Sequence, residues 1–274
     1  MRDFVPPIVL KQIADSQITG LFVTPTHLDA LIGASESDSD FSSLEIVSFA
    51  GALMPDPLLA KVRTRLAARL VNIYGTSEAM NSMYLSNPQS GSAFIPGFYS
   101  EVRIVRVGGA VDEICRPGEE GELFVSANND ALFTEYLDQP IATKEKLADG
   151  WYRTSDAAVL CADGTIQIKG RIDETIISGG ENIHPHEVET VLAQHPNVAD
   201  VAVIGLPNER WGQLVVACVV TKGSLSSTEL EAYMRQSPLA DFKRPRQYFF
   251  LKGIPRNATN KVMRKTLVEQ TSNI

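Results

Sequence analysis

Three patterns of hydrophobic and polar positions follow one another along the chain. In the first, residues 1–84, short apolar runs alternate with segments whose apolar residues recur at helical spacing. This alternation of strand and helix is typical of a parallel sheet, in which ligands bind at the carboxyl ends of the strands. The expected strands are 20–24, which we predict to be buried, 46–51 and 70–74, and the expected helices are 8–15, 26–31 and 57–70.

The second pattern, in residues 85–170, consists of short β-type runs separated by glycine and asparagine turns. We expect strands at 102–107, 121–125 and 165–169, and Asp163–Gly164 is a hairpin turn signal. This pattern favours an antiparallel meander or a small barrel.

The third pattern, in residues 174–274, predicts a smaller α+β unit. Its expected helices are 186–195 and 227–236, and its expected strands are 198–205, 214–220 and 248–251. The predicted fold class is therefore α/β and α+β multidomain, with a partial parallel sheet, a small β-barrel-like subdomain and a small α+β domain.

Length and charge narrow the possible partners. The chain has 274 residues, of which 44% are hydrophobic, so we expect about two globular domains. A net charge of −8 argues against nucleic acid as a partner. From residue 240 to 274, however, eight Lys and Arg residues stand against two acidic residues, which suits a polyphosphate ligand or a solvated basic tail.

The cysteine pattern and the absence of a long apolar run predict a cytoplasmic protein with no membrane partner. Cys115, Cys161 and Cys218 are widely spaced and form no metal-ligand pattern, so we interpret them as reduced and structural. No stretch approaches the roughly 20 apolar residues of a membrane span.

The stretch 170–189, GRIDETIISGGENIHPHEVE, predicts a short strand, a glycine turn at Gly179–Gly180 and a helix entry after Pro185. On its own this is compatible with a surface hairpin that feeds a helix. Two further stretches with compatible chemistry favour a functional interpretation.

The first of these follows the strand that ends at Tyr74. Gly75, Thr76, Ser77 and Glu78 come next. The hydroxyls can donate to a phosphate, and the carboxylate can hold a hard cation. The alternative is an ordinary turn and helix N-cap, which the local pattern leaves equally open.

The second is the polar segment 254–264, which delivers Lys261 just before an apolar periodic segment, although most lysines are simply solvated. A fourth stretch, WYRTSD at 151–156, lies between the turn after Tyr74 and the stretch 170–189. An ionised Asp156 could accept both hydroxyls of a sugar diol, or it could be an ordinary turn residue.

These four stretches, in this order, resemble the adenylate-forming superfamily of acyl-CoA ligases, luciferases and peptide-synthetase adenylation domains. The resemblance covers essentially the whole chain, and within the superfamily it is strongest to ligases of the 4-chlorobenzoate–CoA type. The residues that carry it are TPTHLDAL at 24–31, NIYGTSEAMNS at 72–82, PGFYSEVRIVR at 96–106, IISGGENIHP at 176–185 and LADFKRP at 239–245.

The resemblance implies a two-step reaction and a domain organisation. A carboxylate attacks the α-phosphate of ATP to give an acyl-adenylate and pyrophosphate, and the thiol of CoA then displaces AMP. Residues 1–84 are expected to be an incomplete α/β part of the large domain, 85–172 a β-rich subdomain that completes it, and 173–274 a small lid domain. In such enzymes the small domain rotates about a hinge, which the resemblance places at Asp173.

The resemblance also implies roles for the residues of the adenylation step. Ser77 takes the place of the usual threonine that contacts the α-phosphate, Glu78 binds Mg²⁺, and Lys261 neutralises charge at the α-phosphate. The family usually has Gly before this lysine, where this chain has Asn260, a residue that tolerates left-handed backbone. The nucleotide would be bound by Tyr74, Thr76, Asp156 and Arg171.

For the thioester step, the resemblance implies that Gly179 and Gly180 let the backbone approach the pantetheine. Trp211 and Phe242 would pack on the adenine of CoA, and Arg244, with Lys243 as a further candidate, would contact its phosphates. From sequence alone, both aromatics are more often core residues. An aromatic acid, 4-chlorobenzoate or a related benzoate, would contact Ala50, Ile73, Gly75, Met80 and Asn81.

The phosphate-binding loop of the superfamily, rich in Ser, Thr and Gly, has no counterpart in the chain. We therefore expect a partner, either the missing amino-terminal half or a homo-oligomer, to cover an exposed edge of the first sheet. Two alternatives stay open: a non-catalytic nucleotide- or CoA-binding remnant, and a fragment of a peptide-synthetase adenylation domain.

Overall fold

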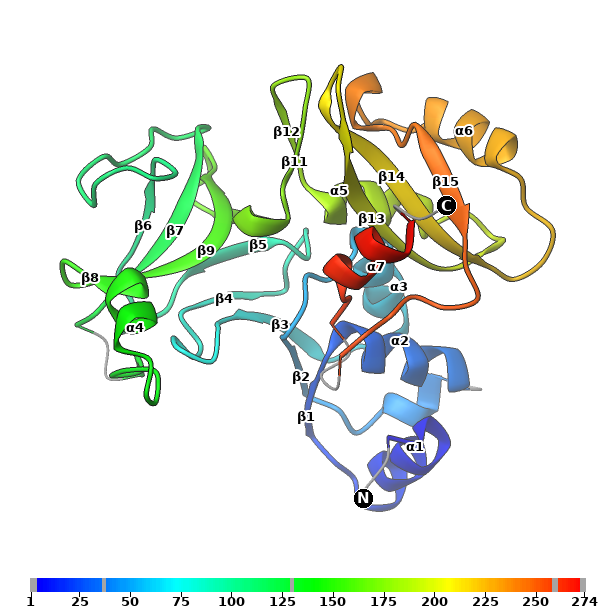
Figure 1. The fold of residues 1–274 in the computed structure, drawn as a ribbon. Coiled ribbons are helices and arrows are strands. Elements are labelled where there is room, and N and C mark those ends of the chain that lie inside the picture. The colour runs from blue at the N-terminus through cyan, green and yellow to red at the C-terminus, as the bar shows by residue number, and fades with distance from the viewer. Residues whose placement is uncertain (1–3, 36–37, 129–130, 258–260, 272–274) are drawn as a thin grey trace. The chain divides into compact units, whose positions relative to one another are not determined.

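The structure is a computed structural model that describes residues 4–35, 38–128, 131–257 and 261–271 (Figure 1). The chain divides into two compact units, Met1–Ile168 and Lys169–Ile274. The division into three segments, with a hinge at Asp173, stays a prediction.

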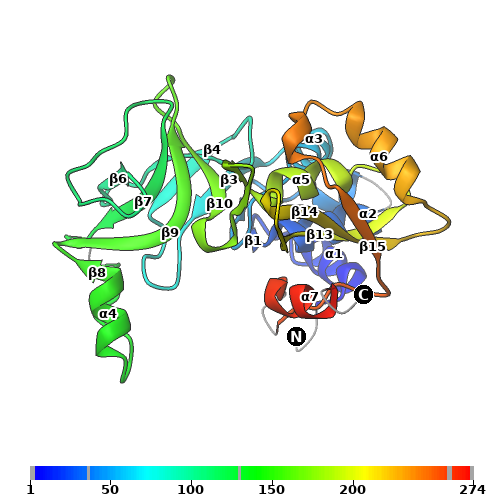
Figure 2. The ribbon, with the colours of Figure 1, turned by 45° about the horizontal axis from the view of Figure 1, so that its top comes forward.

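The first unit is built on one ten-stranded sheet with the strand order β1-β2-β3-β4-β5-β10-β9-β7-β6. The short β8 pairs with β9 and lies beside it (Figure 2). Strands β1, β2 and β3 are parallel, whereas β3–β4, β4–β5, β5–β10, β7–β9 and β6–β7 are antiparallel. The strands are β1 (Gly20–Val23), β2 (Ile46–Phe49), β3 (Arg69–Tyr74), β4 (Met83–Ser86), β5 (Ala93–Pro96), β6 (Val102–Val105), β7 (Glu120–Ser126), β8 (Leu147–Ala148), β9 (Trp151–Leu160) and β10 (Ile166–Arg171), whose last residues belong to the second unit. The helices are α1 (Pro6–Asp15), α2 (Pro25–Ala34), α3 (Asp56–Arg65) and α4 (Pro140–Lys146), with a 3-10 turn η1 (Asp38–Phe41).

The parallel part forms because its helices bury one apolar stripe each against the strands. Helix α2 begins where the Thr24 hydroxyl accepts a hydrogen bond from the His27 N–H at 3.3 Å. Its buried residues Leu28 and Leu31 join a core that includes Val47 and Phe49 of β2. The expected strand-helix alternation is therefore confirmed.

Two predictions for this region are wrong in detail. The helix expected over 57–70 ends at Arg65, because Leu66 is extended (φ −112°, ψ 124°) and turns its buried side chain into the core ahead of β3. The strand at 20–24 forms but is not buried. Among the described strands, β1 pairs with β2 alone and forms an edge of the sheet, and Phe22 is 66% exposed.

The β-rich segment is confirmed as antiparallel strands, and the Asp163–Gly164 turn forms. Gly164 has a φ of 83°, and the Asp163 carboxylate accepts hydrogen bonds from the Thr165 N–H and hydroxyl at 2.9 and 2.7 Å. These strands continue the parallel sheet through β4 and β5, which sequence patterns did not predict.

The second unit has a five-stranded sheet of order β12-β11-β14-β13, with β15 beside β14. Its strands are β11 (Ile176–Ser178), β12 (Glu181–Ile183), β13 (Val198–Asn208), β14 (Gly212–Thr221) and β15 (Gln247–Phe250). Its helices are α5 (Pro185–Leu192), α6 (Ser227–Arg235) and α7 (Arg264–Thr271), with 3-10 turns η2 (Ile172–Glu174) and η3 (Asp241–Lys243).

The near-continuous apolar run of β13 is explained by two cores, one on each face of this sheet. Val201 and Val203 pack with Val188 and Leu192 of α5, and also with residues of α6. The alternate residues Ala202 and Ile204 pack in the second core, to which Leu267 of α7 contributes. Since successive strand residues point to opposite faces, both sets must be apolar.

Two further expectations concern the cysteines, which we interpret as reduced, and the absence of a stretch long enough to span a membrane. Cys115, Cys161 and Cys218 form no disulfide. Within the described ranges, no helix combines the length and the apolar character needed to cross a membrane.

The loop before β5 approaches the loop after β2 so closely that only glycine fits at position 91. A Cβ on Gly91 would lie 1.9 Å from the Met54 carbonyl oxygen. The Gly91 carbonyl accepts a hydrogen bond from the buried Asn72 amide at 3.0 Å, and its N–H donates to the Asp56 carboxylate at 2.8 Å.

We predict that Gly91→Ala destabilises the first unit by about 2 to 3 kcal/mol, since the clash is with backbone that cannot step aside. Chemical denaturation would measure this. Gly33→Ala is the matched control, because a Cβ there meets nothing within 4 Å and lies in helix α2. The control should be neutral or stabilising by up to ~1 kcal/mol. Equal stability of both variants would contradict the account.

Candidate functional site

The candidate site of the first unit begins at the carboxyl end of β3, as expected for a parallel sheet. There Gly75 allows a tight turn, because a Cβ on it would lie 2.6 Å from the Asn81 nitrogen and 3.0 Å from the Ala79 carbonyl. The turn is closed by the Thr76 N–H, which donates to the Ala79 carbonyl at 3.1 Å. The Thr76 hydroxyl accepts from the Ala79 N–H at 3.1 Å.

The Glu78 carboxylate is held by a tyrosine from a distant segment. The Tyr136 hydroxyl donates to Glu78 Oε1 at 2.7 Å, and the Phe133 N–H donates to the Glu78 carbonyl at 2.7 Å. A second tyrosine, Tyr152 of β9, accepts from the Thr76 hydroxyl at 3.3 Å. Residues 131–136 and β9 thus frame the turn after β3.

These hydroxyls set the ionisation of Glu78. Burial of this half-buried side chain acts to raise its pKa, but hydrogen bonds, first that from Tyr136, outweigh burial and leave the pKa below its ordinary value. The carboxylate is therefore charged at neutral pH. Among the described residues no cluster of three or more potential metal ligands occurs. A single carboxylate is nevertheless what Mg²⁺ needs when phosphates and water complete its shell.

A β-bulge in β9 positions Asp156. Between β7 and β9 the register shifts, and Ser155 has a φ of 62°. The Ser155 N–H donates to the buried Glu122 carboxylate at 3.0 Å, and the Thr154 hydroxyl donates to the Leu123 carbonyl at 2.8 Å. Bulges next to functional sites re-aim side chains in this way.

The re-aimed Asp156 carboxylate accepts a hydrogen bond from the Tyr74 hydroxyl at the end of β3. Asp156 is 8% exposed. Burial, followed by the charge of Asp156, raises the pKa of Tyr74 well above its ordinary value, so the phenol stays a donor. Tyr74, Thr76, Glu78 and Asp156 therefore lie around one turn.

The residues expected to contact an aromatic acid also flank this turn. Ala50 follows β2, Ile73 is in β3 and is half-buried, and Gly75 and Asn81 are exposed. Met80 is 60% exposed, so this wall is open to solvent. Ser77 is likewise exposed.

In the second unit, the predicted glycine turn forms at Gly179–Gly180. It joins β11 to a second strand, β12, in a hairpin, and that second strand was not among the predicted elements. Gly179 and Gly180 have φ values of 61° and 87°. The Gly179 N–H donates to the Trp211 carbonyl at 2.8 Å, and a Cβ on Gly179 would lie 3.0 Å from the indole. Trp211 is 43% exposed and Phe242 is 40% exposed, so neither is a core residue.

A cavity of about 290 Å³ lies between α6 and β15. Its lining includes Arg244, Arg246, Ser227, Glu231 and Tyr248. The buried Tyr248 hydroxyl has no hydrogen-bond partner among the residues that the structure describes, and burial raises its pKa to about 12. Arg244, which also pairs with Asp241, and Arg246 outnumber the Glu231 carboxylate in this lining. Together with the unsatisfied Tyr248 hydroxyl, these guanidinium groups can bind an anionic group such as a phosphate.

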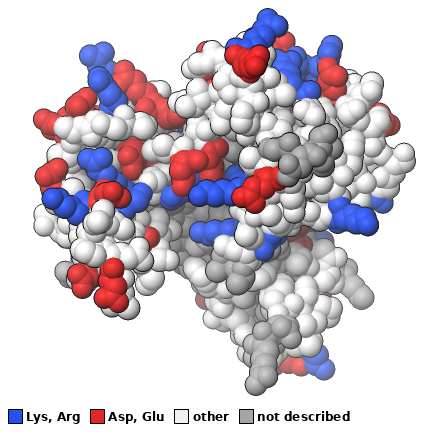
Figure 3. Space-filling model, viewed as in Figure 1, with Lys and Arg blue, Asp and Glu red and all other residues white. Residues whose placement is uncertain are grey.

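The basic carboxyl-terminal segment is largely compensated by acidic partners. Its ion pairs are Lys243–Glu187 at 2.7 Å, Arg244–Asp241 at 2.7 Å, Arg256–Asp200 at 2.9 Å and Arg264–Glu189 at 2.6 Å. On the face seen in Figure 3, acidic and basic side chains lie next to one another. Lys243 is thus engaged by Glu187, which also accepts from the His184 N–H as part of the α5 capping box.

Three further predicted residues lie near the ends of the second unit. The Arg171 side chain donates to Asp173 at 3.1 Å, and both side chains are exposed. Lys261 is exposed, and Asn260 lies outside the described residues. The roles of all these site residues stay predictions.

Family comparisons cover both units. The family model described as "AMP-binding enzyme" matches residues 1–137, and that described as "AMP-binding enzyme C-terminal domain" matches residues 187–261. The chain belongs to the AMP-binding enzyme family. It is 47% identical over 99% of its length to a 4-chlorobenzoate–CoA ligase of Pseudomonas sp. (strain CBS-3), and 41% identical over 97% to one of Arthrobacter sp.. It is also 35% identical over 94% to a 2-succinylbenzoate–CoA ligase of Bacillus licheniformis.

This AMP-binding enzyme chain spans about half the length of the curated relatives it matches, 51 to 53% of those named above. Among solved structures it is similar to o-succinylbenzoate CoA synthetase from Bacillus subtilis in complex with ATP and magnesium, with a TM-score of 0.86 and 31% identity. That similarity covers 97% of this chain and 55% of the other. An amide bond synthetase from Marinactinospora thermotolerans gives a TM-score of 0.87 at 29% identity, covering 99% of this chain and 56% of the other.

Sequence reasoning missed Tyr136, Arg246 and Tyr248. Tyr136 contacts Glu78 across 58 residues of sequence, and no local sequence pattern predicts such a pair. Arg246 could have been found, because it lies two residues after Arg244 in a short extended segment, where both side chains can reach one cavity.

We predict that Tyr136→Phe raises the pKa of Glu78, because it removes the strongest of the hydrogen bonds that favour the carboxylate. A depressed folded-state pKa stabilises the protein above the unfolded-state value and loses that effect as pH falls through the folded value. The variant should therefore have a lower free energy of unfolding than the wild type near neutral pH. When the pH falls below ~4.5, the stability of the variant should decrease less than that of the wild type.

Carboxyl ¹³C NMR titration would measure the pKa directly. Tyr233→Phe is the control, since Tyr233 belongs to the second unit and contacts His195 rather than Glu78. An unchanged Glu78 pKa in Tyr136→Phe would show that the hydrogen bond does not control this carboxylate.

Proposed function

We propose that this chain is part of an AMP-forming ligase that activates an aromatic carboxylate and transfers it to CoA. The observation that carries the proposal is the hydrogen bond between Tyr74 and Asp156, which joins the end of β3 to the bulge of β9. It gathers hydroxyls suited to phosphate, a carboxylate suited to Mg²⁺ and a carboxylate suited to a ribose diol around one turn.

In the first step, the carboxylate oxygen of the acid attacks the α-phosphorus of ATP, and pyrophosphate leaves. Ser77 donates to the α-phosphate, and Thr76 supports the same turn and can donate to a phosphate only by giving up its hydrogen bond to Tyr152. Asp156 and Arg171 orient the ribose. Bound Mg²⁺, held by Glu78, would offset phosphate charge. Lys261 neutralises the charge that develops at the α-phosphate, a task for which a flexible stem with a point charge is suited.

In the second step, the thiolate of CoA attacks the acyl carbon and AMP leaves. The crowded Gly179–Trp211 contact presents the indole as a stacking surface, and Phe242 is a second exposed aromatic ring. The cavity with Arg244, Arg246 and the unsatisfied Tyr248 hydroxyl supports the assignment of a phosphate of CoA to that position.

The proposed acid is 4-chlorobenzoate or a related benzoate. Identity to the two 4-chlorobenzoate–CoA ligases is 47% and 41%, compared with 35% for a 2-succinylbenzoate–CoA ligase and a feruloyl-CoA synthase of Amycolatopsis sp.. A small wall of Ala50, Ile73 and Gly75 suits a flat ring with a compact substituent.

The experiment is acid-dependent exchange of pyrophosphate into ATP, with benzoate, 4-chlorobenzoate and 2-succinylbenzoate compared. It is run with the 274-residue chain alone, and again with a polypeptide that supplies the rest of the Pseudomonas relative. Exchange in either arm supports the ligase. If the folded protein binds nucleotide but gives no exchange in either arm, the proposed ligase activity is wrong and a non-catalytic nucleotide-binding function takes its place.

We predict that Lys261→Ala lowers adenylate formation by about 10²- to 10³-fold, the typical loss for one electrostatic group at a developing charge. Thioester formation from a supplied acyl-adenylate should keep its rate. Lys265→Ala, four residues on in α7, is the control and should change neither step. Equal loss of both steps in Lys261→Ala would contradict its assignment to the first step.

For the second step, Arg246→Ala should raise the KM for CoA by about tenfold. This is the loss of affinity expected when one charge-assisted hydrogen bond to a phosphate is removed. Pyrophosphate exchange should be unaffected, because that step precedes CoA. Lys222→Ala removes an exposed cation after β14 and serves as the control. An unchanged KM would remove the cavity from the CoA site.

A further inference from the structure

Lys261 lies in one of two short segments, residues 255–257 and 261–263, that hydrogen-bond to each other. We call this pair of segments the clasp. The Lys261 N–H donates to the Asn257 side-chain oxygen at 2.9 Å, and the Asn257 N–H donates to the Lys261 carbonyl at 2.9 Å. The Met263 N–H donates to the Pro255 carbonyl at 2.9 Å. These hydrogen bonds join residues 255–257 to residues 261–263, and contacts with the rest of the second unit hold the clasp in place.

Two arginines flank the clasp and attach it to the sheet. Arg256, at its entry, pairs with Asp200 of β13 at 2.9 and 3.1 Å. Arg264, at its exit and three residues after Lys261, donates to Glu189 Oε1 at 2.6 Å and to the Val203 carbonyl at 3.0 Å. The Glu189 carboxylate also accepts from the Val203 N–H at 2.8 Å, so helix α5 and strand β13 share this junction.

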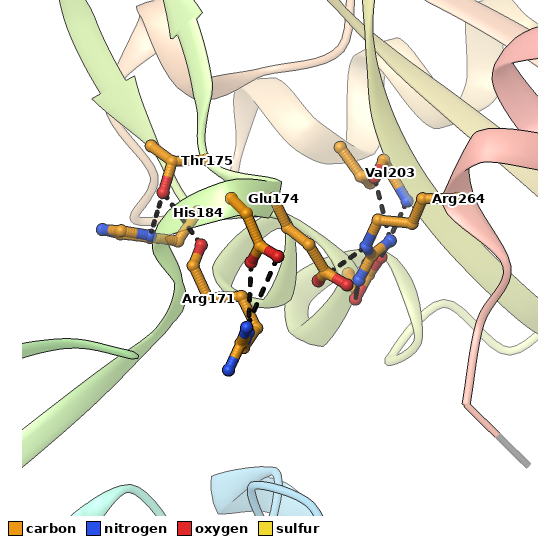
Figure 4. A network of polar contacts seen from close by, with 8 residues as sticks. Arg171, Glu174, Thr175, His184, Val203 and Arg264 are labelled. Atoms are coloured by element: carbon orange, nitrogen blue, oxygen red, sulfur yellow. Dashed lines mark hydrogen bonds and ion pairs between the residues drawn. The ribbon is translucent and has the colours of Figure 1, made fainter. Parts of the chain in front are cut away.

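Arg264 has one more partner, and it lies in the segment that contains the predicted hinge. Its Nε donates to Glu174 Oε2 at 2.9 Å (Figure 4). Glu174 ends the 3-10 turn η2 directly after Asp173, and the following Thr175 hydroxyl donates to the Arg171 carbonyl at 3.0 Å. One guanidinium therefore joins the turn that contains Asp173 to the clasp that contains Lys261.

The ion pair of Arg264 with Glu189 is more buried than that of Arg256 with Asp200. Side-chain exposure is 18% for Arg264 and 15% for Glu189, compared with 32% and 37% for Arg256 and Asp200. Desolvation acts against the charge of Arg264, but the two carboxylates outweigh it and raise its pKa. A planar guanidinium can satisfy three acceptors in fixed directions, which an ammonium group on a flexible stem cannot.

We propose that Arg264 is a positioning residue that couples the turn η2 to the clasp, and so fixes Lys261 relative to the start of the second unit. The coupling is a statement about this chain's own structure. Its meaning for catalysis rests on the proposed function, in which Lys261 serves the adenylation step.

Hydrogen exchange of the full 274-residue chain, without ligands, tests the coupling. The reporters are the amides of Asn257, Lys261 and Met263 in the clasp, and that of Thr175, which donates to the Ile172 carbonyl across η2 at 3.1 Å. In Arg264→Met, exchange should rise on the order of tenfold at both places, because the lost hydrogen bonds belong to both. The β13–β14 amides should keep their protection.

Two variants make the test specific. Arg256→Met should raise exchange in the clasp but leave Thr175 unchanged, because Arg256 pairs with Asp200, whereas Glu174 pairs with Arg264. Glu174→Gln keeps Arg264 and Glu189 together and should raise exchange at Thr175 while the clasp stays protected. If Arg264→Met unfolds, Arg264→Lys takes its place, with a smaller rise at both reporters.

The proposal is overturned if the Arg264 variant loosens only one of the two places. It is equally overturned if β13 and β14 loosen to the same extent, since Arg264 would then only stabilise the unit as a whole. In the complemented enzyme, Arg264→Lys should slow adenylate formation on the order of tenfold and leave thioester formation from supplied adenylate unchanged. Equal loss of both would indicate a purely structural residue.

These outcomes separate the coupling from the proposed function. If wild-type protein gives no pyrophosphate exchange in any arm while the amide reporters respond as expected, the coupling stands and the proposed function fails. If pyrophosphate exchange occurs but the amide reporters do not respond, the proposed function stands and the coupling by Arg264 fails.

Discussion

The carboxylate of Asp156 is 8% exposed, and the Tyr74 hydroxyl donates to it across 82 residues of sequence. A buried charge without such a partner is strongly destabilising, so this contact fixes how β9 meets the end of β3. The same requirement recurs at the buried Glu122, which accepts from the bulge at Ser155. In the second unit it recurs at Arg264, which holds two carboxylates. Pairing of buried charge, more than any single helix, determines where the functional groups lie.

Local chemistry explains which parts of the fold could be predicted. Tyr74, Gly75 and Thr76 were placed at a strand end because a hydrophobic run stops there and glycine follows. The turn at Gly179–Gly180 was predictable for the same reason, since its backbone needs positive φ, although the strand β12 that follows it was not. In both cases a few neighbouring residues contain all the information.

The rest depends on register and on distant residues. The apolar spacing of 57–70 continues past the true helix end at Arg65, because Leu66 and Leu70 are buried by a turn and a strand rather than by a helix. The exposure of Phe22 follows from the place of β1 at the edge of the sheet formed by the described strands, which a local pattern does not encode. The contacts of Tyr136 and Arg264 likewise arise only when segments 58 to 90 residues apart are brought together.

The Gly75 turn has a consequence for how related enzymes can diverge. Its geometry is dictated by backbone atoms of Ala79 and Asn81, and the Thr76 hydroxyl is fixed by the same backbone. Side chains on either side, such as Ile73 and Met80, are not needed to hold that turn. Under the proposed function, substitutions there would reshape the wall for a different acid without moving the groups proposed to contact the nucleotide. If the proposed function holds, substrate choice can evolve in this chain separately from the chemistry of activation.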